Sequence, residues 1–381
     1  MSGALGLAFW VCLAAGIYPY AIYPCLAAAL SMIWSRSVRR EPITPKVTVV
    51  ISAYNEVRCI EATVCNKLAQ DYPADLLDVM VASDGSTDGT DDVLRQLAGR
   101  SSRLAYFRQQ PRRGKTVALN SLVERAGGEI IVFSDANSMY RPDTVRRLVE
   151  NFADPSVGYV TGKMIYVNPD GSTVGDGCSA YMRYENWLRG RETLLGSVVG
   201  VDGGVDAVRR VLYRPMEADQ LPDFVLPLQV VDQDYRVVFE PLAQLCEDTL
   251  TDSSAEFRMR VRVSLRSLWA LLSEASLLNP LRRPLFAWQL WSHKALRYLS
   301  FLPLAAACVL NVILATVSNL YLALLGVQLL VWLAVWAGAR GSRLSAARFA
   351  YYFALLNAAS AVAFVRFVRG HKQVLWQPRT G

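Results

Sequence analysis

Charged residues are absent from two long stretches of the chain, and this pattern restricts the fold more than any other feature. None occurs before Arg36, and none between Arg297 and Arg340. A helix that crosses the hydrocarbon core of a bilayer needs only about 20 apolar residues. The first stretch therefore predicts one span, over 5–30, and the second predicts two spans joined near Asn319. A shorter apolar stretch, 349–365, is a candidate for a last span.

The basic residues beside these stretches predict their orientation. A secretory signal peptide begins with a positive segment, whereas here the cluster Arg36, Arg39 and Arg40 follows the apolar run, which favours an anchor. The positive-inside rule then places this cluster and the middle of the chain in the cytoplasm, with the anchor in the inner or plasma membrane. If 349–365 also crosses, the basic residues after it lie outside. Either that segment lies along the membrane, or the number of spans differs by one.

Composition excludes several other classes of protein. With 52% hydrophobic and 19% charged residues, the chain is too apolar to be disordered. The net charge of +7 comes from basic residues that flank the apolar stretches, so it indicates membrane topology and no nucleic-acid partner. Seven scattered Cys without a C-x-x-C pair, and only two His, argue against a disulfide framework or a zinc site.

The middle of the chain alternates predicted strands with helical patterns. Three runs rich in β-branched residues, 46–52, 77–82 and 129–133, are each followed at once by a polar cluster. Alternating strands and helices favour a parallel sheet covered by helices, in which ligands bind beyond the carboxyl ends of the strands. We therefore expect the three polar clusters, 53–56, 83–88 and 134–137, to form one site.

Three common ligand-binding motifs are incomplete or absent in this part of the chain. An EF-hand loop that begins at Asp84 would need a carboxylate at its twelfth position, which is Arg95. Gly114-Lys115-Thr116 resembles the end of a P-loop, but the first glycine of that motif would be Gln109. No G-x-G-x-x-G follows the first strand, which counts against a dinucleotide site.

A set of ordered motifs carries a resemblance to one family. They are VVISAYNE (49–56), ASDGSTDGT (82–90), RGKTVALN (113–120), FSDANS (133–138), GVDGGVDAVRR (200–210), LPDFVLPLQVVDQDYRVVFEP (221–241) and RGHKQVLWQPR (369–379). Together they resemble the membrane-bound family 2 glycosyltransferases, the group that includes cellulose, hyaluronan and poly-N-acetylglucosamine synthases. Each motif is weak evidence alone, but their number and their order make the resemblance specific. Together the motifs extend over most of the chain.

The resemblance implies a fold class and a division of the chain. The expected class is α/β: a GT-A-like domain that binds a nucleotide-diphosphate sugar, with a mostly parallel sheet, plus transmembrane and interfacial helices. We expect an N-terminal membrane anchor (1–40), a cytoplasmic glycosyltransferase domain (41–257), interfacial amphipathic helices (258–297), C-terminal transmembrane helices (298–368) and a tail (369–381). Trp376 in the tail is expected to serve as an aromatic membrane anchor.

The resemblance also implies the residues that hold the donor. A nucleotide-diphosphate sugar is expected to contact Ala53, Asn55, Glu56, Asp84, Lys115 and Asp135. Mg²⁺ or Mn²⁺ is expected on Asp135, with Asn137 standing where the family's D-x-D-like motif has its second acid. Such hard cations take carboxylate oxygens and keep sites for substrate phosphates. The structural alternatives are a helix cap for Asp135, a tight turn for the cluster at Asp84 and a solvated loop for Lys115.

The acceptor side follows from the later motifs. Asp223 matches the second acid of the family's acidic pair, and Pro222 replaces the first, so Asp223 is the expected general base. Gly203, Gly204 and Arg209 resemble the acceptor loop. The family's Q-x-x-R-W signature is missing, and a basic stretch with Arg258 and Arg262 stands at its place, where it could meet the diphosphate, the acceptor or anionic lipid headgroups.

The resulting hypothesis is a membrane-embedded, metal-dependent, inverting transferase. It would move a sugar from a nucleotide-diphosphate donor, UDP-linked, to a growing polysaccharide or glycolipid acceptor, with membrane lipids as further partners. The first alternative is transfer of a single sugar to a lipid-linked acceptor. The second is a catalytically silent membrane scaffold that binds a nucleotide sugar, against which the intact acids Asp84, Asp135 and Asp223 argue.

Overall fold

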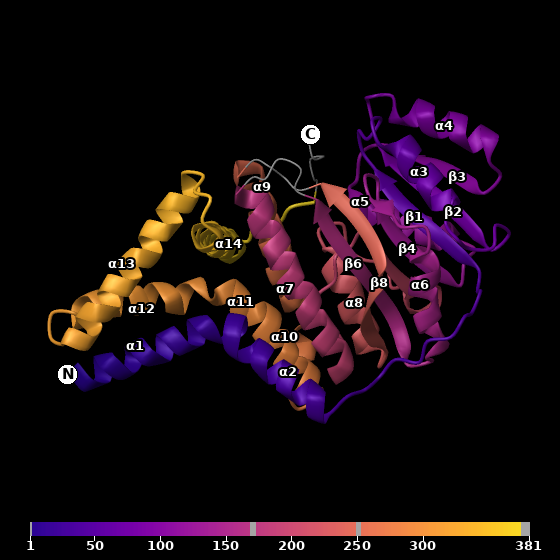
Figure 1. Cartoon of the computed structure of the whole chain (residues 1–381). Coiled ribbons are helices and arrows are strands. Elements are labelled where there is room, and N and C mark those ends of the chain that lie inside the picture. The colour runs from indigo at the N-terminus through magenta and orange to yellow at the C-terminus, as the bar shows by residue number, and fades with distance from the viewer. Residues whose placement is uncertain (1, 168–172, 249–252, 375–381) are drawn as a thin grey trace. The chain divides into compact units, whose positions relative to one another are not determined.

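The computed structural model describes residues 2–167, 173–248 and 253–374. The chain forms two compact units, one mainly helical (1–32, 166–184 and 248–371) and one built on a sheet (33–165, 185–247 and 372–381). The predicted tail is described only as far as Val374, and Trp376 lies outside the described residues. Figure 1 gives the element labels used below.

The sheet unit contains eight strands and the helices that cover them. The strands are β1 (Val47–Ala53), β2 (Leu77–Asp84), β3 (Leu104–Gln109), β4 (Ile130–Asp135), β5 (Met139–Tyr140), β6 (Val157–Val167), β7 (Asp206–Arg209) and β8 (Arg236–Asp248). The helices are α3 (Ile60–Leu68), α4 (Thr90–Arg100), α5 (Lys115–Arg125), α6 (Thr144–Glu150) and α8 (Pro222–Asp232), with short 3₁₀ turns η2 (Asn151–Ala153) and η3 (Arg210–Leu212).

The strand order is β3-β2-β1-β4-β7-β6-β8-β5. The first half, β3-β2-β1-β4, is parallel, and β7 pairs antiparallel with both β4 and β6. The three predicted strands correspond to β1, β2 and β4, and their parallel pairing is confirmed. The chain order reverses between β1 and β4, which is the point where α/β sheets bind ligands.

The core of the sheet unit follows from the composition of these strands. All seven residues of β1 are buried, because α5 packs on the sheet at β1 and β2 while α3 packs on β2. Strands buried on both faces read as continuous apolar runs. This burial fixes the carboxyl ends of β1, β2 and β4 at one edge.

The helical unit contains the two charge-free stretches. Its helices are α1 (Ser2–Ile17), α2 (Tyr23–Ile33), α9 (Ser253–Ser273), α10 (Pro284–Leu290), α11 (Leu296–Leu299), α12 (Phe301–Leu314), α13 (Asn319–Ala339) and α14 (Ser345–Val368). The π-helical turns η1 (Tyr18–Ile22) and η5 (Trp291–Ala295) and the 3₁₀ turn η4 (Ala275–Leu278) join them. Helix α7 (Thr173–Leu195) begins in the helical unit and ends in the sheet unit.

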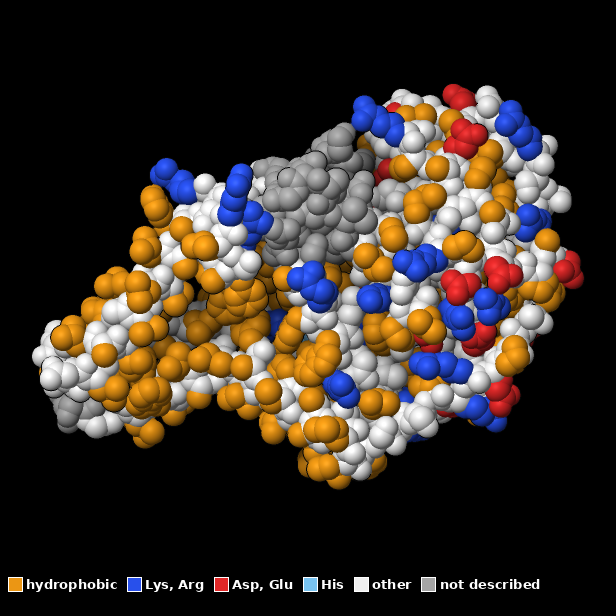
Figure 2. Space-filling model, in the orientation of Figure 1, with side chains coloured by type: hydrophobic (Ala, Val, Ile, Leu, Met, Phe, Trp, Pro, Cys, Tyr) orange, Lys and Arg blue, Asp and Glu red, His pale blue; other side chains and the backbone are white. Residues whose placement is uncertain are grey.

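Three helices among the described residues are long and apolar enough to cross a membrane: 3–33, α13 and α14. Pro19 lies in the π-helical turn η1, within the first of them. Figure 2 shows hydrophobic side chains covering α12 and α13, with Lys and Arg side chains where α13 ends. A helix that is apolar on all sides is typical of a membrane span.

The structure differs from the sequence expectation in the stretch 298–339. Its first half forms α12, which has 14 residues and spans about 21 Å, shorter than the ~30 Å core of a bilayer. Only together with the preceding helices, from which it is bent by 55°, does α12 reach the length of a span. The hydropathy pattern does not reveal this break, which falls at Ser300 between α11 and α12, because no charged residue marks it.

Candidate active site

The three predicted polar clusters meet at one edge of the sheet. In the parallel register, Ser52 lies beside Asp135 and Ala53 lies beside Ser83. Asp84 and Asp135 are the last residues of β2 and β4. Because parallel strands end at the same edge, the loops that follow β1, β2 and β4 adjoin one another.

Asp135, Lys115 and Asp223 converge beyond this edge, although they lie far apart in the chain. The Lys115 ammonium lies 2.6 Å from Asp135 Oδ1 and 3.8 Å from Asp223 Oδ1. The exposed fractions of the Lys115, Asp135 and Asp223 side chains are 21%, 33% and 30%. These groups are therefore held in place by the fold while remaining open to a ligand.

Two helix N-termini present Lys115 and Asp223. Lys115 is the first residue of α5, after Gly114 with φ 94°. Asp223 lies in the first turn of α8, directly after Pro222, which suits the first position of a helix. The helix dipole stabilises a carboxylate at such a position by about 0.3–1 kcal/mol. A negatively charged Asp223 thus agrees with its local structure.

A glycine turn separates the two carboxylates. Gly203 has φ 81°, and a Cβ placed on it would lie 2.5 Å from both carboxylate oxygens of Asp223. A Cβ on Gly204 would lie 3.5 Å from Asp135 Oδ2. The predicted acceptor-loop glycines therefore lie against the candidate base and the candidate metal ligand, and no other residue fits at 203 without moving Asp223.

Asp84 is completely buried and holds the loop that leads to Lys115. It accepts hydrogen bonds from Gln109 Nε2 at 2.5 Å, from the Arg113 amide at 2.8 Å and from the Gly114 amide at 2.9 Å. The Arg112 guanidinium lies 3.6 Å from the same carboxylate and 3.5 Å from the centre of the Tyr54 ring. Burial of a charged carboxylate is tolerated here because it is fully hydrogen-bonded.

The loop after β1 is bonded to the loop after β2. Asn55 has φ 56°, its amide N–H donates to Ser86 Oγ, and its side-chain oxygen accepts from the Thr87 amide at 2.8 Å. The Glu56 amide donates to Thr90 Oγ1 at 2.9 Å. Ala53, Asn55, Glu56 and Asp84 therefore belong to one connected structure at the edge of the sheet.

Lys67 is a buried residue beneath the Asp135 turn that the motif analysis does not identify. Its ammonium donates to Ser138 O at 2.5 Å and to Asn66 Oδ1 at 2.9 Å, and lies 3.7 Å from the centre of the Tyr140 ring. Burial lowers the pKa of Lys67 to about 7, opposed by the nearby charge of Asp135. The available signal in the sequence is a lysine on the otherwise buried face of α3, in line with Ile60 and Val64.

Replacing Lys67 by Met should lower activity without unfolding the protein. Methionine fills a similar volume but cannot bond the Ser138 carbonyl, so the turn that carries Asp135 and Asn137 loses one of its supports. Changes to residues that support ligands typically cost ten- to a hundredfold in metal affinity or activity. Donor turnover as a function of Mn²⁺ concentration measures the effect. Lys46→Met, at a partly exposed lysine paired with Asp78, serves as a control, and equal turnover in both variants would contradict the expectation.

The donor set at Asp135 fits a divalent cation that is held in part by substrate phosphates. Asp135 is part-exposed at a strand end, and the Lys115 ammonium already marks a position for positive charge between two carboxylates. Asn137 donates through Nδ2 to Glu247 Oε1 at 3.0 Å. The described residues contain no cluster of three or more His, Cys, Asp or Glu that would hold a metal alone. Mg²⁺ in particular is bound through one or two carboxylates together with phosphates and water.

Within the sheet unit, one residue predicted to bind the acceptor, Arg209, is not brought to this edge. Arg209 lies beside Ile130, at the opposite end of β4 from Asp135, and donates to the carbonyls of Val157 and Phe152. Arg258 and Arg262 lie on α9 in the helical unit. Their part in binding an acceptor stays a prediction.

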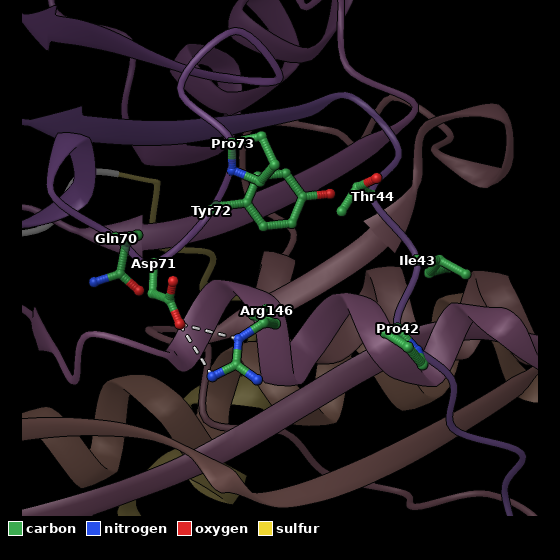
Figure 3. Close-up of a pocket in the computed structure, with 8 residues that line it drawn as sticks. All are labelled: Pro42, Ile43, Thr44, Gln70, Asp71, Tyr72, Pro73 and Arg146. Carbon is green, nitrogen blue, oxygen red and sulfur yellow. Dashed lines mark hydrogen bonds and ion pairs between the residues drawn. The ribbon is translucent and has the colours of Figure 1, made fainter.

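A surface hollow of about 470 Å³ lies in another part of the sheet unit. It is lined by the segment before β1, the residues after α3 and one residue of α6, which are Pro42, Ile43, Thr44, Gln70, Asp71, Tyr72, Pro73 and Arg146. Figure 3 shows Asp71 and Arg146 directed toward each other. Arg146 Nη2 lies 3.1 Å from Asp71 Oδ2. None of the residues predicted to bind substrate lines this hollow.

Comparison with known proteins finds similarity to glycosyltransferases over part of the chain. A model described as glycosyl transferase family 2 matches residues 48–210. The beta-monoglucosyldiacylglycerol synthase of Nostoc sp. strain PCC 7120 is 30% identical over 168 residues, which are 44% of this chain and 36% of that protein. The poly-beta-1,6-N-acetyl-D-glucosamine synthase of Staphylococcus aureus strain COL is 25% identical over 202 residues, 52% of this chain and 48% of that protein. The chain thus spans less than half the length of these two relatives.

A solved structure resembles nearly the whole chain. It is a mannosyltransferase from Pyrobaculum calidifontis in complex with GDP-Man and Mn²⁺, with a TM-score of 0.75, 24% identity and coverage of 96% of this chain and 99% of that one. This likeness establishes the GT-A fold that the resemblance implied. Within this fold, residues 48–210 match the glycosyl transferase family 2 model.

Proposed function

We propose that the chain is a membrane-embedded, inverting glycosyltransferase that moves a sugar from a nucleotide-diphosphate donor to a polysaccharide or glycolipid acceptor. The observation that carries the proposal is the convergence of Asp135, Lys115 and Asp223 beyond the carboxyl edge of the sheet, around the turn at Gly203. The reaction requires a positively charged group for the diphosphate, a carboxylate that can bind a metal ion and a second, part-exposed carboxylate that can accept a proton.

Each group has a defined task in the proposed reaction. Lys115 contacts the diphosphate and offsets the negative charge that grows on it as the bond to the sugar breaks. Asp223 takes the proton of the acceptor hydroxyl, whose oxygen forms a bond to the anomeric carbon. The electron pair of the broken bond leaves with the nucleoside diphosphate. Because attack and departure occur on opposite faces, the anomeric configuration inverts.

A bound Mg²⁺ or Mn²⁺ would supply a Lewis acid for the diphosphate, with Asp135 as its protein ligand and Asn137 as a neutral neighbour. Support comes from the relative of the same fold, whose structure contains Mn²⁺ with GDP-Man. Ala53, Asn55, Glu56 and Asp84 form the proposed nucleotide side of the site, because they belong to the loops that follow β1 and β2. We propose a UDP-linked sugar as the donor.

The membrane arrangement is part of the proposal. We infer an anchor at 1–40, a catalytic domain at 41–257 that faces the cytoplasm, interfacial helices at 258–297, transmembrane helices at 298–368 and a tail at 369–381. Support comes from the three long apolar helices and from the basic cluster after the first of them. Labelling of single cysteines placed beside Arg39 and in the loop after α13, in right-side-out and inverted vesicles, tests the orientation.

A second candidate is the transfer of one sugar to a lipid-linked acceptor. The segment that stands in place of the family's Q-x-x-R-W signature is packed within the helical unit. There the buried Glu256 accepts from Arg260 Nε and from Tyr352 O–H, both at 2.8 Å. One relative is also a glycolipid synthase by name.

The full-length protein in lipid nanodiscs provides the test of both candidates. We expect Mn²⁺-dependent thermal stabilisation and slow nucleotide release with one member of a panel of UDP-glucose, UDP-galactose, UDP-N-acetylglucosamine and GDP-mannose. A product ladder from that donor supports polymerisation, and a single added sugar on a lipid supports the second candidate. Stabilisation without turnover in the presence of lipid and glycan acceptors would favour a silent scaffold and contradict the proposed function.

A further inference from the structure

Asp206 is a completely buried carboxylate in the middle of the sheet, and the proposed reaction does not use it. It is the first residue of β7 and lies beside Phe133 of β4 and Thr161 of β6. Burying an ionised carboxylate is costly unless it is paired and hydrogen-bonded. A carboxylate at this position therefore calls for a physical explanation.

The contacts of Asp206 connect it to the turn beside Asp223. Its Oδ2 accepts a hydrogen bond from the Gly203 amide at 2.8 Å. No described group meets the distance and angle of a hydrogen bond to its Oδ1, although the hydroxyl groups of Thr161 and Tyr159 face the carboxyl group. Gly203 is also the residue on which a Cβ would lie 2.5 Å from both oxygens of Asp223. Asp206 thus fixes the backbone on one side of Gly203, and the Asp223 carboxylate rests on the other.

The charged and titratable groups that face Asp206 come from two strands, one helix and one loop. They are Tyr159 of β6, Tyr140 of β5, Asp202 of the preceding loop and Asp223 of α8. Asp202 is paired with Arg189 at 2.5 Å, and Asp223 faces Lys115 at 3.8 Å. No ion pair involves Asp206 among residues 2–167, 173–248 and 253–374. Burial raises the pKa of Asp206 to about 7, with the hydroxyl groups of Thr161 and Tyr159 opposing the shift and the charges of Asp223 and Asp202 adding to it.

We propose that Asp206 is a positioning residue for the general base, which holds the Gly203 turn against Asp223 and, by its charge, strengthens Asp223 as a proton acceptor. This inference rests on the proposed function, since it requires Asp223 to be the base. Below about pH 7 Asp206 is protonated and neutral. Above that pH it is negative, and a like charge facing Asp223 favours the protonated form of Asp223. The transfer rate should therefore rise through this range.

Asp206→Asn separates the charge of the residue from its hydrogen bond. Asparagine can still accept from the Gly203 amide but does not titrate. We expect the single-turnover rate of the wild type, with saturating donor from the panel above, to rise about three- to tenfold as Asp206 ionises. The Asn variant should lack this rise yet match the wild type within about twofold at pH 6. Asp206→Ala, which also loses the hydrogen bond, should be slower than the Asn variant at every pH.

Thermal unfolding checks that the variants fold and that Asp206 is the titrating group. The folded state keeps its proton up to about pH 7, whereas an unfolded Asp loses it near pH 4. Raising the pH from 4 to 7 therefore costs stability in the wild type. Asp206→Asn should unfold at a higher temperature than the wild type at pH 8 and show no such gain at pH 4. Asp75→Asn, at an exposed Asp, should show no pH-dependent difference.

The outcomes distinguish this inference from the proposed function. If Asp206→Asn keeps the wild-type pH profile while Asp223→Asn is inactive, the role of Asp206 is overturned and the proposed base stands. If Asp223→Asn transfers sugar at the wild-type rate, both are overturned, whatever Asp206→Asn does. Loss of the rise near pH 7 in the Asn variant alone supports the inference.

Discussion

Replacing Asp223 by Asn is expected to reduce sugar transfer about 10²- to 10⁴-fold, which is the usual contribution of a positioned general base. Asparagine is nearly the same size, so the turn at Gly203 and the start of α8 should keep their structure. Lys115 and Asp135 remain 2.6 Å apart and available to a diphosphate. The affinity for the donor should therefore change by less than about threefold, as measured by titration calorimetry beside single-turnover kinetics.

A variant at the other end of the same helix is the matched control for Asp223. Asp232 is the last residue of α8 and pairs with Arg214 at 3.3 Å. Asp232→Asn should transfer sugar at nearly the wild-type rate. If both Asn variants are equally active, Asp223 is a helix-terminal residue and not the base. If Asp223→Asn also loses donor binding, its carboxylate acts on the donor.

Asp135→Ala should weaken both donor binding and transfer, and this distinguishes it from Asp223→Asn. The carboxylate at the end of β4 is the proposed ligand of the divalent ion, so its loss should lower donor affinity at least tenfold and remove most of its dependence on Mn²⁺. The Lys115 ammonium, no longer held by Asp135, is then expected to pair with Asp223 and compete with the acceptor hydroxyl for the Asp223 carboxylate. Donor titrations with and without Mn²⁺ measure the effect.

The control for Asp135 is a carboxylate of similar exposure away from the site. Asp143 pairs with Arg147 at 3.0 Å at the start of α6. Asp143→Ala should keep the wild-type dependence on Mn²⁺. Asp135→Ala with unchanged donor affinity and unchanged Mn²⁺ dependence would instead assign Asp135 a purely structural role.

The parallel half of the sheet could be predicted because its signals are local. Each of β1, β2 and β4 is a continuous run of buried, mostly β-branched residues that ends in polar ones. Parallel pairing places these ends at one edge, so the expected meeting of Asp84 and Asp135 loops follows from pattern alone. The motifs supplied Lys115, Asp223 and Gly203 only by resemblance, because their proximity depends on the packing of α5 and α8.

The antiparallel half of the sheet could not be predicted from the sequence pattern. Strand β7 has only four residues, two of them charged, and such a segment is typical of a loop. The direction of β7 explains why Gly203 lies at the site and Arg209 does not. Strand β7 begins at Asp206 beside Phe133, near the site, and runs away from it to Arg209 beside Ile130. The role of Lys67 could not be predicted for a different reason. Its ammonium donates to the backbone carbonyl of Ser138, and a sequence motif contains no information on such a contact.

The apolar helices could be foreseen for similar reasons. Absence of charge is a property of composition, and α13 and α14 lie where hydropathy places them. The bend before α12 leaves no mark in the hydropathy pattern.

The left-handed turn at Gly203 limits how the proposed active site can be redesigned. In a library that randomises 200–205 to change acceptor specificity, most members would be inactive because of the codon for Gly203. Every side chain at that position displaces the Asp223 carboxylate. Keeping that codon fixed while varying Val201 and Val205 would separate substrate preference from loss of chemistry.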